Sequence, residues 1–222
     1  MKLHAILRPY CNLMHDIKTR VDAMQKLAKN RSRLPEHVAY ECEQLQIRMI
    51  SETLAIACLL VHGDIEGARS KRLTKAYQAD FIINALEQLH PKFYPQPTRQ
   101  ILKNGIPVGL ENITNGFLTK GEMLKSYRDA AGHLHVGNLD GFLANEAETS
   151  DRQAVKAWVG KLTVLLGHHS IFLAAGPDTW DGREPLRFAD GEIAPRFQII
   201  VQMAPDGQEW PRATIFESIG QA

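Results

Sequence analysis

The sequence predicts a mainly α-helical protein, a helical bundle of about five helices with a short internal β-hairpin and a small C-terminal β-hairpin. Three observations predict this class. Apolar residues recur at helical spacing over the first 90 residues, and Gly-containing turns separate two pairs of short β-prone runs. The composition, with 44% hydrophobic and 23% charged residues, is typical of a folded globular chain.

The first three predicted helices follow the apolar periodicity. The first covers residues 3–29, and Pro9 either starts its main body or kinks it, because proline lacks the N–H that a helix interior needs. The second helix is expected over residues 36–62. The third is expected over residues 65–90, where Pro91 ends it.

The next elements are predicted from turn and capping signals. Asn104-Gly105 lies between apolar runs and predicts a hairpin within residues 98–112. Thr119-Lys120-Gly121-Glu122 has the pattern of a capping box, so a helix is expected over residues 120–136. A second capping signal starts a fifth helix, which we expect over residues 150–176.

The C-terminal part of the chain differs in composition from the helical part. It is rich in Pro, Gly and Asp, except for β-prone runs at residues 197–203 and 213–216, which predict a terminal hairpin. We therefore expect a helical domain over residues 1–176, with the first hairpin inserted in it, and a hairpin appendage over residues 177–222.

Composition also excludes several classes. Three scattered cysteines without CxxC spacing predict neither a disulfide scaffold nor a thiolate zinc site, and favour a reducing, cytoplasmic location. The longest strongly apolar stretch, residues 54–62, is too short to span a bilayer, so no membrane partner is expected. The net charge of +1 gives no strong field for a polyanion, so any contact with nucleic acid must be local.

The densest group of reactive side chains lies at residues 127–135, Tyr-Arg-Asp-Ala-Ala-Gly-His-Leu-His. On a helix that turns about 100° per residue, Arg128 and His135 lie within roughly 20° of one face, whereas Arg128 and His133 point about 140° apart. Asp129 and His133 are four apart and can meet as an acid–imidazole pair.

A guanidinium beside an imidazole can cleave a phosphodiester without a metal or other cofactor. The guanidinium holds phosphate oxygens, and the imidazole moves protons near neutral pH. The structural alternative is that Arg128 pairs with a carboxylate on a neighbouring helix, while the histidines sit at a helix C-terminus whose dipole favours their positive charge.

These residues resemble a known family. Arg128-Asp129-x3-His133 fits the Rx4-6H motif of the HEPN superfamily, and His135 satisfies the wider Rx6H spacing. The pattern around the motif, over residues 36–140, looks like that of a group of bacterial HEPN-like proteins. It comprises Gln46-Ile47-Arg48-x3-Glu52, Phe93-Tyr94-Pro95-x-Pro97, Tyr127, Gly132 and His135-Val136-Gly137-Asn138.

The resemblance implies a helical, metal-independent endoribonuclease of a defence or toxin–antitoxin system. It implies a homodimer in which two motifs face each other across a cleft, with Arg128, Asp129 and either His133 or His135 as catalytic residues. The histidine would deprotonate the ribose 2′-hydroxyl or protonate the leaving 5′-oxygen, and Arg128 would stabilise the phosphorane. The product would carry a 2′,3′-cyclic phosphate.

Other residues near the motif are expected to contact the substrate. They are Arg48, Lys125, Tyr127 and Asn138. For Arg48 the alternative is a structural ion pair with Glu52, four residues further along the same predicted helix.

The expected partners are a second copy of the chain, single-stranded RNA, and a cognate antitoxin or defence protein. The main alternative is a non-catalytic HEPN-like module that binds a nucleotide or a protein. A metal-dependent hydrolase built from His133, His135, Asp129 or Asp140 is disfavoured, because His-x-His places two ligands on one ion only if the helix unwinds.

Two further features lie outside the motif. Arg69-Ser70-Lys71-Arg72-x2-Lys75 is the strongest basic run, and it predicts either a solvated helix face or a strip that follows phosphates. His169, the second of two adjacent histidines, continues an apolar face and is expected to be a core histidine with satisfied hydrogen bonds.

Overall fold

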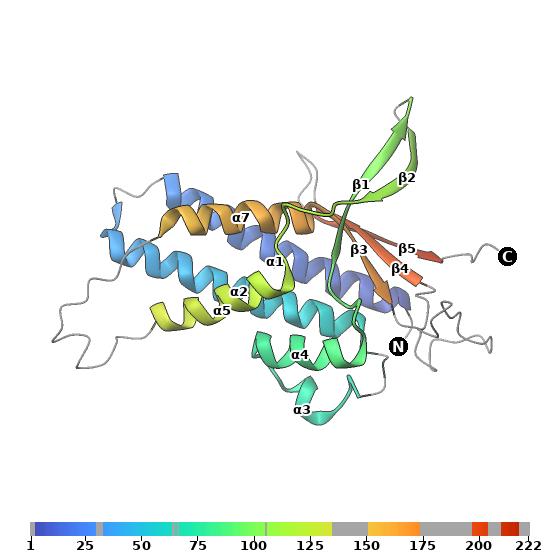
Figure 1. Ribbon diagram of the computed structural model, residues 1–222, viewed down its shortest axis with the longest axis horizontal. Helices are drawn as coiled ribbons and strands as arrows, with labels where there is room; N and C mark the ends of the chain where they lie inside the picture. The colour runs from blue at the N-terminus through green and yellow to red at the C-terminus, as the bar shows by residue number, and fades with distance from the viewer. Residues whose placement is uncertain are drawn as a thin grey trace.

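The protein is mainly helical, with a small antiparallel sheet at one end of the long helices (Figure 1). The computed structural model describes residues 3–29, 33–63, 65, 67–104, 106–134, 151–173, 197–203 and 210–217. The helices in this part of the chain are α1 (Leu3–Lys29), α2 (Glu36–Val61), α3 (Lys71–Thr74), α4 (Ala79–Leu89), α5 (Lys120–His133) and α7 (Arg152–Gly167). The strands are β1 (Gln96–Lys103), β2 (Ile106–Asn112), β3 (His168–Leu173), β4 (Phe197–Gln202) and β5 (Arg212–Glu217).

Helix α2 is the central helix of the core. It packs against α1, α4 and α5, and Ile50, Leu54 and Cys58 on it have no exposed surface. Among the described helices, α2 is the one long and apolar enough to cross a membrane by length and composition, because it contains an 18-residue window of high mean hydropathy with at most two charged residues. A share of 56% of its apolar window is buried inside the protein, so a position in the core accounts for this composition.

The prediction of a single helix over residues 65–90 is wrong. Gly67 has a φ of +92°, which a right-handed helix does not accommodate. The Ser70 side chain then accepts a hydrogen bond from the Leu73 amide at 3.3 Å and starts the short helix α3. Helix α4 then begins separately at Ala79. The helical spacing of apolar residues therefore continues through segments that are turns in the structure.

The prediction that the fifth helix continues to residue 176 is also wrong. Helix α7 ends at Gly167, and His168 has the extended backbone that begins strand β3. Residues 168–173 are mostly buried, and a short apolar run of this kind fits a buried strand as well as a helix. Pairing with strands from distant parts of the chain decides the outcome.

Strand β3 joins the two predicted hairpins into one sheet. The strand order is β2-β1-β3-β4-β5, and every neighbouring pair is antiparallel. The contact of β3 with β1 is short, Gln96 opposite Ser170 and Pro97 opposite His169, whereas β3 pairs with β4 along its whole length. The predicted boundary between residues 176 and 177 lies outside the described residues, but the terminal hairpin continues the sheet.

One hydrophobic core runs between the helices and reaches the sheet at strands β3 and β4. Tyr10 and His169 connect α1 to β3 inside the core. Both side chains have no exposed surface, and Tyr10 Oη lies 2.8 Å from His169 Nε2. His169 Nδ1 lies 2.9 Å from the Leu166 carbonyl, to which it donates, so Nε2 accepts from the tyrosine hydroxyl. The expectation that His169 is a satisfied core histidine is confirmed.

Candidate functional site

The candidate motif lies on α5, which is held at its N-terminal end by the predicted capping box. The Thr119 side chain accepts from the Glu122 amide, and the Glu122 carboxylate accepts from the Thr119 amide at 3.0 Å. Lys161 of α7 also donates to this carboxylate. Lys161 first, and then the Thr119 amide, lower the pKa of Glu122 to about 2. The start of α5 is thus tied to α7.

One face of α5 is buried and the other is open. Met123, Tyr127 and Ala130 are buried, and α5 packs against α2 and α4. Arg128 and Asp129 lie on the exposed face. The separation follows from helical geometry, because residues three or four apart share a face and adjacent residues do not.

Arg128 is exposed and forms no hydrogen bond or ion pair with any described residue. The structural alternative for Arg128, a pair with a carboxylate on a neighbouring helix, is therefore not present in the described part of the chain. The guanidinium is open to solvent on the outer face of a short, well-anchored helix, where an anionic ligand has access to it.

The other described members of the motif make contacts within the protein. Asp129, which we expected to meet His133, accepts from Lys125 Nζ at 2.5 Å, and both side chains of that pair are half exposed or more. The ring of His133 is half buried and meets Tyr40 of α2 edge-on, with ring centroids 5.3 Å apart and planes at 79°. The lysine thus neutralises the carboxylate next to Arg128.

Within one chain, Arg128 and His133 do not converge. The sequence places them about 140° apart around α5, and in the structure Arg128 is exposed while His133 packs towards α2. The two side chains therefore lie on different faces of α5. His135 and Asn138, the remaining motif residues, lie outside the described residues.

Arg48, Glu52 and Tyr127 form a polar cluster between α2 and α5. Tyr127 Oη donates to Glu52 Oε1 at 3.2 Å, and Arg48 Nε donates to the same oxygen at 3.2 Å. The Arg48 guanidinium carbon lies 5.7 Å from the centroid of the Tyr127 ring. Burial first, and then the Glu52 carboxylate, raise the pKa of Tyr127.

These contacts connect α2 and α5, and they leave few polar atoms of the cluster free to bind a ligand. The ion pair of Arg48 with Glu52, the structural reading of these residues, is present, and the Tyr127 side chain is almost fully buried. Both residues that we expected to contact substrate therefore have polar atoms engaged inside the protein. What they do in this structure is to hold α5 against α2.

Tyr127→Phe is expected to lower the free energy of unfolding by about 1 kcal/mol, because it removes a hydrogen bond to a mostly buried carboxylate. Urea unfolding of the two chains measures this difference. Tyr77→Phe is the matched control, since Tyr77 is 62% exposed and its variant should unfold like the parent chain. Equal loss in both variants would show that the Glu52 contact does not stabilise the helix pair.

Sequence reasoning missed Tyr40 as the neighbour of His133. The available signal is the spacing on α2, where Tyr40, Gln44, Arg48 and Glu52 follow each other at intervals of four and lie along one stripe of the helix. Both ends of this stripe contact α5, through His133 and Tyr127. The orientation of α5 over this stripe comes only from the tertiary structure.

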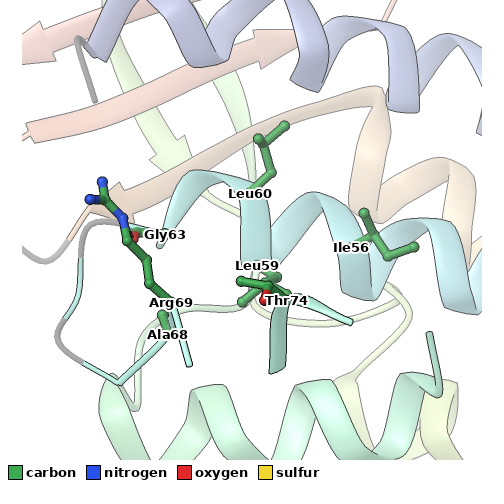
Figure 2. A pocket seen from close by; sticks show the side chains of 7 residues that line it. All are labelled: Ile56, Leu59, Leu60, Gly63, Ala68, Arg69 and Thr74. Atoms are coloured by element: carbon green, nitrogen blue, oxygen red, sulfur yellow. Dashed lines mark hydrogen bonds between the residues drawn. The ribbon is translucent and has the colours of Figure 1, made fainter. Parts of the chain in front are cut away.

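A pocket of about 520 Å³ lies at the other end of α2 (Figure 2). None of the predicted site residues lines it. Its walls come from the last turns of α2 and the segment that leads into and through α3: Ile56, Leu59, Leu60, Gly63, Ala68, Arg69 and Thr74. Among the described residues, no three His, Cys, Asp or Glu side chains are grouped so as to hold a metal ion.

No protein-family model, curated protein or solved structure matches this chain.

Proposed function

We propose that this protein is a metal-independent endoribonuclease that acts as a homodimer through Arg128 and a histidine of the same segment, in a defence or toxin–antitoxin setting. The observation that carries the proposal is the exposure of Arg128, which has no partner among the described residues. An exposed arginine without a protein partner has its whole fork open to an anion such as a phosphate.

The chemistry needs a proton carrier and a charge stabiliser. His133 or His135 removes the proton of the ribose 2′-hydroxyl, and the 2′-oxygen attacks the adjacent phosphorus. The guanidinium of Arg128 stabilises the negative charge of the phosphorane, and an imidazolium protonates the leaving 5′-oxygen. The products are a 2′,3′-cyclic phosphate and a free 5′-hydroxyl.

The divergence of Arg128 and His133 on one helix supports the homodimer in this proposal. With Arg128 and His133 about 140° apart around α5, a phosphate shared by these two groups favours Arg128 from one copy and His133 from another, whereas the spacing of His135 puts it on the Arg128 face of the same helix. A two-fold symmetric pair of α5 helices brings such groups together twice, because every contact in an isologous interface is repeated.

Cleavage of a fluorescent single-stranded RNA in the presence of EDTA tests the function. We expect cleavage, with a cyclic phosphate on the upstream product detected by mass spectrometry. The same RNA with 2′-O-methyl riboses should stay intact, because the nucleophile is blocked. Intact RNA after prolonged incubation with the full chain would overturn the proposal.

A mixing experiment tests the composite site. Arg128→Ala and the double variant His133→Ala/His135→Ala are each expected to be inactive, and co-expression should restore about a quarter of the parent activity. Random pairing makes about half of the dimers mixed, and each mixed dimer has one intact pair of groups out of two. Absence of recovery in a sample with mixed dimers, verified by differently tagged copies, would show that the site does not combine two chains.

The second candidate is a non-catalytic HEPN-like module that binds a nucleotide or a protein. It is favoured by the contacts of the motif itself, since Asp129 is paired with Lys125 and the His133 ring packs against Tyr40. Binding of RNA or of a partner that depends on Arg128, without cleavage of RNA, would identify this function.

A further inference from the structure

The segment from residue 67 to residue 79 carries an excess of positive charge that the proposed site does not use. It contains four basic residues, Arg69, Lys71, Arg72 and Lys75, and no acidic residue, while Asp64, Glu66 and Asp80 flank it in the sequence. The four positive charges are therefore concentrated between residues 69 and 75. The four side chains are exposed.

This segment is a fixed platform. Ala68 is 1% exposed and Leu73 is 3% exposed, so the chain is anchored in the core on one side. The Ser70 cap starts α3, and the α3 turn directs its remaining side chains outward. Lys71, Arg72 and Lys75 form no ion pair with any described residue. We name Lys71, Arg72, Lys75 and Tyr77 the α3 basic surface.

Flat groups accompany these charges. Tyr77 is 62% exposed, the largest exposure among the large hydrophobic side chains that the structure describes. The Arg72 guanidinium carbon lies 4.7 Å from the centroid of the Phe81 ring. An exposed phenol ring and a guanidinium that lies over an aromatic ring are both groups on which nucleobases stack.

The apolar pocket opens beside this surface. Thr74, which lies between Arg72 and Lys75, and Arg69 both line it, and the opposite wall is formed by Ile56, Leu59 and Leu60 (Figure 2). Its volume of about 520 Å³ is within the range of small-molecule sites. A ligand on the α3 basic surface therefore has an apolar recess within reach.

Asp80 follows this segment at the start of α4, and its Oδ1 accepts from the Phe81 amide at 2.8 Å. Glu87, further along α4, is paired with Lys120. Neither carboxylate forms an ion pair with Lys71, Arg72 or Lys75 among the described residues, so these cations are open to a polyanion.

We infer that the α3 basic surface binds single-stranded RNA, with Lys71, Arg72 and Lys75 on phosphates and Tyr77 stacked on a base. The inference deepens the proposed function and rests on it for the choice of RNA. The combination of cations with exposed flat groups and an apolar recess favours a strand whose bases are unpaired, because a duplex hides its bases. In Figure 1, α3 lies at the periphery of the protein beside α4.

The test uses the full chain and a fluorescein-labelled 20-nucleotide single strand with 2′-O-methyl riboses, which cannot be cleaved. Fluorescence anisotropy is measured between 50 and 200 mM NaCl, a range over which phosphate contacts give roughly linear log–log salt dependence. Lys71→Gln/Lys75→Gln is expected to weaken binding and to reduce the salt slope by about 1.4, at about 0.7 per phosphate contact. Tyr77→Ala is expected to weaken binding at least about fivefold with the slope unchanged.

The matched control is Lys26→Gln/Lys29→Gln, which removes the same two charges from exposed positions at the end of α1 and should bind like the parent chain. The inference is overturned by no binding at 50 mM NaCl, by parent-level binding of the Lys71→Gln/Lys75→Gln and Tyr77→Ala variants, or by equal loss in the control. It is also overturned by equal affinity for a duplex of the same sequence, or by preference for vesicles with 30% phosphatidylserine over the oligonucleotide. Thermal unfolding of each variant verifies that it is folded.

The inference and the proposed function fail separately. A chain that binds the modified strand through Lys71, Lys75 and Tyr77 but cleaves no RNA retains the inference and loses the nuclease. A chain that cleaves RNA, and binds the modified strand unchanged by these substitutions, retains the nuclease and loses the inference.

Discussion

Replacing Arg128 by alanine is expected to lower the rate of RNA cleavage by at least about 100-fold, because it removes a preorganised donor to the charge that develops in the transition state. The cleavage rate of Arg128→Lys is expected to fall between those of the parent chain and Arg128→Ala. Lysine keeps the positive charge but lacks the two-pronged fork that fits phosphate oxygens. Initial rates on the fluorescent RNA in EDTA measure both effects.

The stability of the Arg128→Ala chain should be nearly unchanged. The side chain is exposed and has no partner among the described residues, so the free energy of unfolding is expected to change by no more than about 0.5 kcal/mol. Arg99→Ala is the control for loss of an exposed arginine and should cleave RNA like the parent chain, because Arg99 is 68% exposed on β1 and paired with Glu111 across the hairpin. Parent-level cleavage by Arg128→Ala would contradict the role of this residue.

Acid is expected to destabilise the fold through two buried histidines. Burial, together with a neighbouring histidine, lowers the pKa of His169 to about 4, against the opposing effect of the Leu166 carbonyl. Burial first, and also His90, lower the pKa of His62 to about 4, although the Cys58 and Phe172 carbonyls at its two ring nitrogens oppose this.

The direction of the effect follows from proton uptake. Unfolded histidine titrates near 6.5, so between pH 6.5 and 4 the unfolded chain binds more protons than the folded chain. The contribution of both histidines to stability is complete above pH 6.5 and is lost as the pH falls towards 4. By pH 5 the loss is about 2 kcal/mol per histidine, a large share of the roughly 5–15 kcal/mol of a typical domain.

Urea unfolding at pH 7.5, 6 and 5 measures this loss. His169→Gln is the informative variant, because its amide keeps a donor and an acceptor for the Leu166 carbonyl and Tyr10 but does not titrate. It should show about half of the pH dependence of the parent chain. A parent chain whose free energy of unfolding is flat between pH 7.5 and 5 would show that these imidazoles are not held neutral by burial.

Capping and periodicity were sufficient to predict the long helices. Residues 3–29 and 36–61 are helical as expected, since each has an apolar face that recurs every three to four residues. Thr119 and Glu122 form the predicted capping box, and the Asn104 turn lies in the predicted hairpin, with a φ of 52° at Asn104. These features depend on neighbours within about four residues, which a sequence displays directly.

The placement of the motif was predictable in part. The angle between Arg128 and His133 is a property of any helix, and their divergence follows from the sequence alone. The pairing of Tyr127 with Glu52 and the contact of His133 with Tyr40 were not predictable, because they depend on how α5 lies across α2. Helix propensity contains no information about such crossings.

The sequence by itself determined the long helices α1 and α2, the capping box of α5 and the turn at Asn104, because these arise from backbone conformation and from contacts between near neighbours in the chain. Only the tertiary structure decided that residues 168–173 form a strand between β1 and β4, and that this strand unites the two hairpins in one sheet. A short buried apolar run satisfies either conformation locally, so its hydrogen-bond partners, distant along the chain, determine the outcome.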